Sequence, residues 1–273
     1  MAPLEAIFVW IALGSYAVTS ALYIYSFVFK NEKILRNIVY LTAVSFLFHT
    51  VSILARYHAV GYLPIAGDYE TAQGGSWIVI LFTLYISFRH KTLKGVGVAT
   101  LPFSLLLLGF GVMRNPVLTP MAASLKSFWM YIHVLFAQIA FGAYTIAFGI
   151  AVLYLLKEKK PGKQFYNKLP ELPRLDDLMF RLVVFGFITD AVMISSGAIW
   201  AKDLWGNYWS WDPVETWSLV TWLIYGLTIH LRVTMGWKGR KMAWLVIIAL
   251  SGMIITFFGV NLVVDTSIHM FEV

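Results

Sequence analysis

Tryptophan, histidine and carboxylate side chains in this chain follow a pattern that could hold a flat metal complex. Residues 205–217 read WGNYWSWDPVETW, and six of the 11 tryptophans lie between Trp200 and Trp222. Aromatic faces stack on other flat π-systems, and each such pair contributes about 0.5–1.5 kcal/mol beyond the burial of area. The segment could therefore form a floor for a porphyrin-sized ligand. It could equally be an interfacial belt, because tryptophan and tyrosine also collect at membrane surfaces.

The carboxylates of this segment have a structural explanation of their own. Asp212-Pro213-Val214-Glu215 is typical of a helix start, with Asp212 as the N-cap, proline at the first helical position and Glu215 in the capping-box position. We therefore predict a helix that begins at this Asp-Pro pair. The helix start accounts for the carboxylates and leaves both interpretations of the aromatic cluster open.

Histidine is the donor that an iron porphyrin would use here, because the chain contains no cysteine. His133 lies one to two turns into a predicted span and His269 follows the last span, so both are expected near the tryptophan segment. His230 lies roughly 20–25 Å down the span that follows Asp212, at 1.5 Å per residue. An ionisable residue at that depth indicates a functional role. The other histidines fit packing or solvated positions: His49, His58 and His90.

The elements that must position these residues are membrane helices. The chain is 59% hydrophobic and 13% charged, whereas a soluble domain carries about 25% charged residues. A membrane span needs roughly 20 apolar residues. The sequence predicts an all-α, polytopic membrane helix bundle, a single domain over residues 1–273, with about eight spans at about 5–28, 37–55, 76–89, 95–113, 128–156, 178–200, 214–236 and 242–264.

The basic residues predict how these spans are oriented. Most of the 21 lysines and arginines lie in alternate connections, among them a polar linker at about 157–177. Because positive charge stays on the cytoplasmic side during insertion, we expect both termini and the tryptophan loop, about 201–216, on the external side. The net charge of +7 is then a topology signal and does not indicate a nucleic-acid partner.

The segment WGNYWSWDPVETWSLVTWLIYGLTIHLR resembles the WWD segment of the haem-handling proteins of cytochrome c biogenesis. Within that group the chain is most similar to the CcsA/ResC family of system II. The similarity extends to LKSFWMYIHVLFAQIAFGAY around His133, to FFGVNLVVDTSIHMF before His269 and to HTVSILARYHAVGYLPIAGDYE upstream. Two positions depart from the family: Val214 stands where a basic residue is expected, and SIHMF differs from the usual tail.

The resemblance implies a haem-export subunit of a cytochrome c synthase that works with a second membrane protein, CcsB/ResB. Haem b, the transported substrate, would bind a transmembrane site through His230 and then an external site between His133 and His269. The WWD loop would cradle it there, with contacts from Trp205, Trp209, Trp211 and Asp212.

The same resemblance implies the reaction that follows. The haem vinyl groups would form thioether bonds with the CxxCH motif of apocytochrome c, whose thiols thioredoxin-like proteins keep reduced. The chain would belong to a cytochrome c-type haem lyase and act mainly by positioning haem, with no covalent catalytic residue of its own. We expect it in the lipid of the bacterial inner membrane, or of the thylakoid membrane if a plastid encodes it.

Two alternatives differ in what they predict. A haem-delivery protein of the CcmC type would load haem onto a chaperone, and such proteins have six spans. A transporter of a non-haem substrate would use the aromatic loop only as an interfacial belt, and it would tolerate replacement of His133 and His269.

Overall fold

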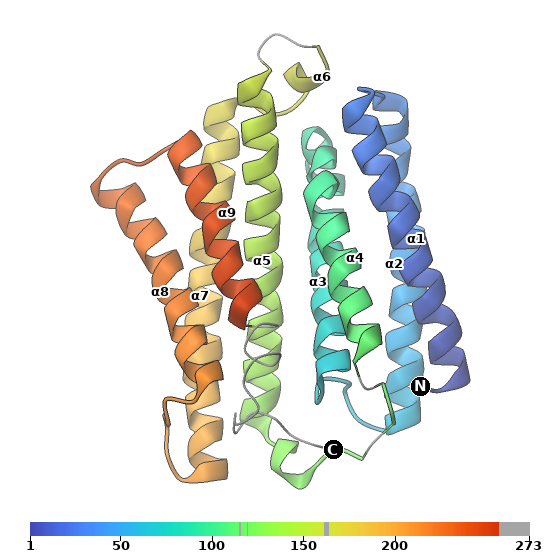
Figure 1. The fold of residues 1–273 in the computed structure, drawn as a ribbon, viewed down its shortest axis with the longest axis vertical. Coiled ribbons are helices and arrows are strands. Elements are labelled where there is room, and N and C mark those ends of the chain that lie inside the picture. The colour runs from blue at the N-terminus through green and yellow to red at the C-terminus, as the bar shows by residue number, and fades with distance from the viewer. Residues whose placement is uncertain (115, 119, 161–163, 257–273) are drawn as a thin grey trace. The chain divides into compact units, whose positions relative to one another are not determined.

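The computed structural model describes residues 1–114, 116–118, 120–160 and 164–256, and every regular element in these ranges is helical (Figure 1). The chain divides into two compact units. Unit 1 comprises Met1–Met121 and Leu155–Leu175, and unit 2 comprises Ala122–Tyr154 and the chain from Asp176 onward. We describe each unit by itself. The single domain expected over residues 1–273 stays a prediction.

Unit 1 is built on four long helices that pack side by side (Figure 1). They are α1 (Pro3–Val28), α2 (Glu32–Val60), α3 (Asp68–Arg89) and α4 (Gly97–Met113), with a 3-10 turn at Lys91–Val96 before α4. Small hydroxyl residues line the contacts: the Ser76 and Ser104 hydroxyls lie 2.7 Å apart and join α3 to α4. Small residues let apolar helices approach closely, which is how membrane helices gain packing energy.

Helix α3 begins at Asp68, well before the predicted start at 76. Gly74 and Gly75, directly before that predicted start, lie inside the helix. This region is packed tightly, because a Cβ atom at Gly111 of α4 would lie 2.8 Å from the Cβ of Ala72. Tertiary packing on α4 therefore outweighs the low helix propensity of the two glycines.

The segment expected to be a polar linker also packs on unit 1. It contains the short helix α6 (Gln164–Asn167). Phe165 is buried with its ring 5.2 Å from that of Phe27 on α1. The Lys157 ammonium donates hydrogen bonds to the carbonyls of Leu169 and Pro170. Buried aromatic contacts thus hold part of this otherwise polar segment.

Unit 2 contains the tryptophan segment and most of the candidate ligands. Its helices are α5 (Phe128–Lys159, whose last turn belongs to unit 1), α7 (Leu172–Trp205), α8 (Pro213–Thr234) and α9 (Arg240–Ile254), preceded by the 3-10 turn Ala123–Leu125. Stacked rings fill its interior: Tyr144 on Tyr225 with centroids 3.5 Å apart, and Phe187 on Trp222 at 4.5 Å. Helices α5 and α7 meet where a Cβ atom at Gly186 would clash with the Tyr144 ring at 2.5 Å.

Six helices in the described residues are long and apolar enough to cross a membrane: α1, α2, α3, the stretch Lys91–Met113, α5 and α7. This confirms the prediction of an all-α, polytopic membrane bundle. Helices α8 and α9 form where the seventh and eighth spans were predicted. They are not among the six, because α9 is described over only 15 residues and polar side chains lie along α8, including His230.

Candidate functional site

The helix start predicted at Asp212 is confirmed. The Asp212 carboxylate accepts a hydrogen bond from the Val214 N–H at 2.9 Å, and Glu215 accepts one from the Asp212 N–H at 3.3 Å. Together they form a capping box, with proline at the first position of α8. Such a cap satisfies backbone donors that the first turn leaves without helical partners.

Glu215 does more than cap the helix. Its Oε2 atom also accepts hydrogen bonds from the Ser210 N–H at 2.8 Å and the Ser210 hydroxyl at 3.1 Å. The carboxylate is buried, so these charge-assisted bonds form away from water, where they are strongest. One side chain of α8 therefore fixes the backbone of the tryptophan loop. The sequence pattern predicted the cap but not this second role.

The loop holds Trp211 in a backbone conformation that destabilises the folded protein. Its φ is +60°, in the left-handed region, and such a conformation costs a non-glycine residue about 1–3 kcal/mol. The side chain is 69% exposed, so burial does not offset that cost. Trp209 lies beside it, with ring centroids 5.8 Å apart and planes at 84°. The strained backbone presents an exposed indole, as both a ligand floor and an interfacial belt require.

His133 of α5 is held in one orientation by α7. Its Nδ1 atom lies 2.9 Å from the carbonyl oxygen of Met193. A carbonyl only accepts, so Nδ1 carries the proton and Nε2 carries the lone pair. Metal-binding histidines have this arrangement, in which the second ring nitrogen donates to a carbonyl or carboxylate.

Aromatic contacts connect His133 to the start of the loop. The His133 ring lies 6.2 Å from that of Trp200, and Trp200 lies 5.7 Å from Trp205. The imidazole also packs against Gly197, where a Cβ atom would lie 2.6 Å from Nδ1. Trp200 and Gly197 were not among the expected contacts. The sequence did contain a signal for these two contacts, because the two residues lie one helical turn apart, next to the aromatic segment.

The structure separates His230 from this group. It lies on α8, about five turns beyond the cap at Asp212, on an exposed stripe with Leu223 and Leu227. The end of its helix is fixed, because Arg232 binds Asp176 at 2.6 Å and the second Asp176 oxygen accepts from the Gly239 N–H at 2.8 Å. An exposed imidazole on an apolar helix face is open to a ligand or a partner. His269 lies outside the described residues.

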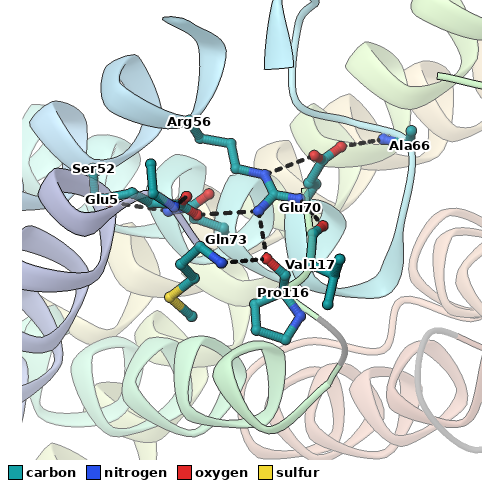
Figure 2. A network of polar contacts seen from close by, with 10 residues as sticks. Glu5, Ser52, Arg56, Ala66, Glu70, Gln73, Pro116 and Val117 are labelled. Atoms are coloured by element: carbon teal, nitrogen blue, oxygen red, sulfur yellow. Dashed lines mark hydrogen bonds and ion pairs between the residues drawn. The ribbon is translucent and has the colours of Figure 1, made fainter. Parts of the chain in front are cut away.

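A buried ionic network in unit 1 was missed by the sequence analysis. Figure 2 shows the Arg56 guanidinium between two carboxylates, with Nε 2.9 Å from Glu70 and Nη1 3.3 Å from Glu5. It also donates to the carbonyls of Pro116 and Val117. The available signal was the charge at the ends of predicted spans: Glu5 begins the first span and Arg56 directly follows the second.

The network also fixes the loop between α2 and α3. The second oxygen of Glu70 accepts a hydrogen bond from the Ala66 N–H at 2.7 Å. In the same loop, burial and the Glu70 carboxylate raise the pKa of the Tyr62 phenol, because both disfavour the phenolate. One arginine therefore joins the start of α1, the end of α2 and the start of α3 to the loops that follow α2 and α4.

Comparison with known proteins identifies the family. A family model described as Cytochrome C assembly protein matches residues 74–268. A cytochrome c biogenesis protein CcsA of Prochlorococcus marinus (strain NATL2A) is 31% identical, over 82% of this chain and 81% of that relative. The chain belongs to the CcsA family of cytochrome c assembly proteins.

Other CcsA proteins support this membership. The CcsA of Chlamydomonas reinhardtii is 35% identical over 81% of this chain, which spans 64% of that relative. The CcsA of Guillardia theta is 29% identical, over 84% of this chain and 85% of that relative. These names favour the CcsA interpretation over the CcmC-type alternative.

A solved structure shares the CcsA-family fold of this chain. It is named Cytochrome c Heme Lyase CcmF and aligns with a TM-score of 0.69 at 17% identity. The alignment covers 93% of this chain and 46% of CcmF. At this identity the likeness concerns the fold alone.

Proposed function

We propose that this CcsA-family protein handles haem for cytochrome c assembly, binding it at an external site beside the tryptophan loop. One observation carries the proposal: the Met193 carbonyl orients the His133 imidazole through Nδ1, which makes Nε2 the nitrogen that would bind iron, next to a run of tryptophans. Imidazole is the common axial ligand of haem iron. His269 is the proposed second ligand of that site.

The residues of the tryptophan loop fit a porphyrin. Trp205, Trp209 and Trp211 supply flat faces and apolar edges, and the Nε1 atom of Trp209 is buried without a hydrogen-bond partner among the described residues. Asp212 and Glu215 hold the loop backbone through hydrogen bonds. In this proposal Asp212 does not contact haem and affects its binding by holding the tryptophan rings in place. In this proposal the protein supplies the iron ligand, aromatic rings on which haem stacks, and apolar surroundings that keep water away from haem.

The chain's part in thioether formation is to position haem. Each cysteine thiol of an apocytochrome CxxCH motif adds across one haem vinyl group, with the sulfur bonding to one vinyl carbon and hydrogen to the other. The chain has no cysteine that could compete for the vinyl groups. Holding haem beside the incoming thiols makes the addition effectively unimolecular. Thioredoxin-like reductants would keep those thiols reduced.

His230 would hold haem earlier in its path. Its position on an exposed apolar stripe of α8 supports a site that is completed from outside this chain. A membrane protein of the CcsB/ResB type is the proposed partner, because it would cover the stripe and supply the second ligand. The proposed location is the bacterial inner membrane or a thylakoid membrane, with the loop on the external side.

An absorption spectrum of the dithionite-reduced protein, purified with its partner, tests the external site. We expect a low-spin, bis-histidine spectrum that weakens in His133→Ala and recovers when imidazole is added. His58→Ala is the matched control, because His58 is exposed on α2 in unit 1. A wild type without haem, or a spectrum indifferent to His133, would contradict the proposal and favour the non-haem transporter.

A further inference from the structure

A small cavity, with several polar side chains in a largely apolar lining, lies in the interior of unit 2, and no proposed role uses it. Its volume is about 20 Å³, and the lining includes side chains from all four long helices of the unit: Tyr144, Asp190, Met193, Thr221 and Met253, with Thr256 just beyond α9. A water molecule needs about 10–15 Å³ of such space and two to four polar partners. The cavity is therefore large enough for a water molecule and far too small for haem.

The polar groups at this cavity are arranged around Asp190. The Tyr144 hydroxyl donates a hydrogen bond to the Asp190 carboxylate at 3.2 Å, and the Thr221 and Thr256 hydroxyls lie 2.8 Å apart. The Tyr225 ring stacks on Tyr144, and its buried hydroxyl has no hydrogen-bond partner among the described residues. Buried polar atoms left without a protein partner usually bind an ordered water.

Asp190 lacks a cation to balance its charge. The side chain is 5% exposed in the middle of a membrane-spanning helix, and no ion pair to it forms in the part of the chain that the structure describes. The titratable groups that face it are Tyr144 from α5 and Tyr225 from α8. Helix α9 contributes Met253, which does not titrate. An isolated carboxylate in such a medium is costly, so a proton or bound water must compensate it.

We propose that Asp190 is a proton-binding residue in a hydrated site, where its carboxyl group exchanges its proton with a buried water. Tyr144 and the Thr221–Thr256 pair hold that water together with Asp190, and the Tyr225 ring stacks on Tyr144. The site lies one helical turn from Met193, whose carbonyl fixes His133. A proton bound there changes the electrostatic field at that imidazole. The inference needs no haem and stands apart from the proposed function.

Radiolytic hydroxyl labelling of the wild-type protein tests for the water. Radicals formed from a bound water oxidise the side chains next to it, and mass spectrometry reads the products. Met253 lines the cavity and is 3% exposed, whereas Met242 on the same helix is 0% exposed and does not line it. We expect Met253 to be oxidised at least several-fold faster than Met242. Equal rates would overturn the hydrated site, and no variant has to fold for this comparison.

Infrared difference spectroscopy tests for the proton. We expect a carboxylic-acid C=O band at neutral pH that shifts in D₂O and is missing from Asp190→Asn. Tyr225→Phe is the second variant, because it keeps the carboxyl group and removes one neighbour; its band should remain at a shifted frequency. A carboxylate band that disappears in Asp190→Asn would show an ionised Asp190 and overturn the proposal, and so would the absence of any difference between Asp190→Asn and wild type.

Discussion

The Nδ1 atom of His133 lies 2.9 Å from the carbonyl oxygen of Met193, so a backbone group on α7 orients a side chain on α5. The contact requires the two helices to be close, and Gly197 permits this because a Cβ atom there would lie 2.6 Å from Nδ1. The orientation of the proposed iron ligand, His133, is therefore set by two residues that would not bind the iron themselves.

Replacing Gly197 with alanine should displace the His133 ring. Because outer contacts of metal-binding histidines contribute 10–100-fold to affinity, we expect a loss of about that size in haem affinity at the external site. Haem titration of the partner complex, followed by absorbance, measures it. Gly14→Ala is the control, because no atom lies within 4 Å of a Cβ at Gly14. Unchanged affinity in Gly197→Ala would show that the ring tolerates movement.

Replacing Trp211 with glycine should separate stability from function. Glycine adopts positive φ readily. We therefore expect the free energy of unfolding to rise by up to about 1–3 kcal/mol as the strain disappears. Holocytochrome c yield should fall, because the exposed indole is removed. Tyr208→Ala serves as the control for removing another exposed aromatic ring of the same loop. A full yield in Trp211→Gly would assign Trp211 to the interfacial belt.

Breaking the ionic network of unit 1 should destabilise the protein. Arg56→Ala leaves Glu5 and Glu70 buried without a cation, and we expect a loss of about 3–5 kcal/mol in the free energy of unfolding. Denaturant or thermal unfolding in detergent measures it. Arg181→Ala removes an exposed pair with Asp177, which is worth about 0.3–0.5 kcal/mol.

Neutralising the whole network distinguishes charge from packing. The triple variant Glu5→Gln, Arg56→Met and Glu70→Gln removes all three charges at similar volume. We expect it to be more stable than Arg56→Ala alone, because no unpaired carboxylate remains. Both variants lose the hydrogen bonds from Arg56 to Pro116 and Val117, so a triple variant no more stable than Arg56→Ala would show that the unpaired carboxylates are not what destabilises Arg56→Ala.

The exposed stripe beside His230 should be covered in the complex. The chain has no cysteine, so Leu227→Cys introduces a single thiol for labelling. We expect a membrane-permeant maleimide to modify it at least several-fold more slowly when the partner is present. Ile188→Cys is the control, since Ile188 is exposed on α7. Equal protection at both positions would point to a general effect of the complex, and no protection at Leu227→Cys would contradict a partner on this face.

The sequence by itself determined the features that depend on neighbouring residues. Long apolar runs predict membrane helices because backbone groups in lipid must be satisfied within the segment. The start of α8 at Asp212 followed from local capping chemistry, which acts over four residues. Local rules failed for α3, where packing against α4 extended the helix through Gly74 and Gly75.

Only the tertiary structure decided which distant residues meet. Arg56 binds Glu5 and Glu70, and the three residues lie on three different helices. Nothing in their spacing along the chain indicates that they pair. The same is true of His133 with Met193 and of Tyr144 with Asp190. Periodicity tells which face of a helix is apolar, whereas the choice of neighbouring helix depends on close packing of particular side chains around small residues.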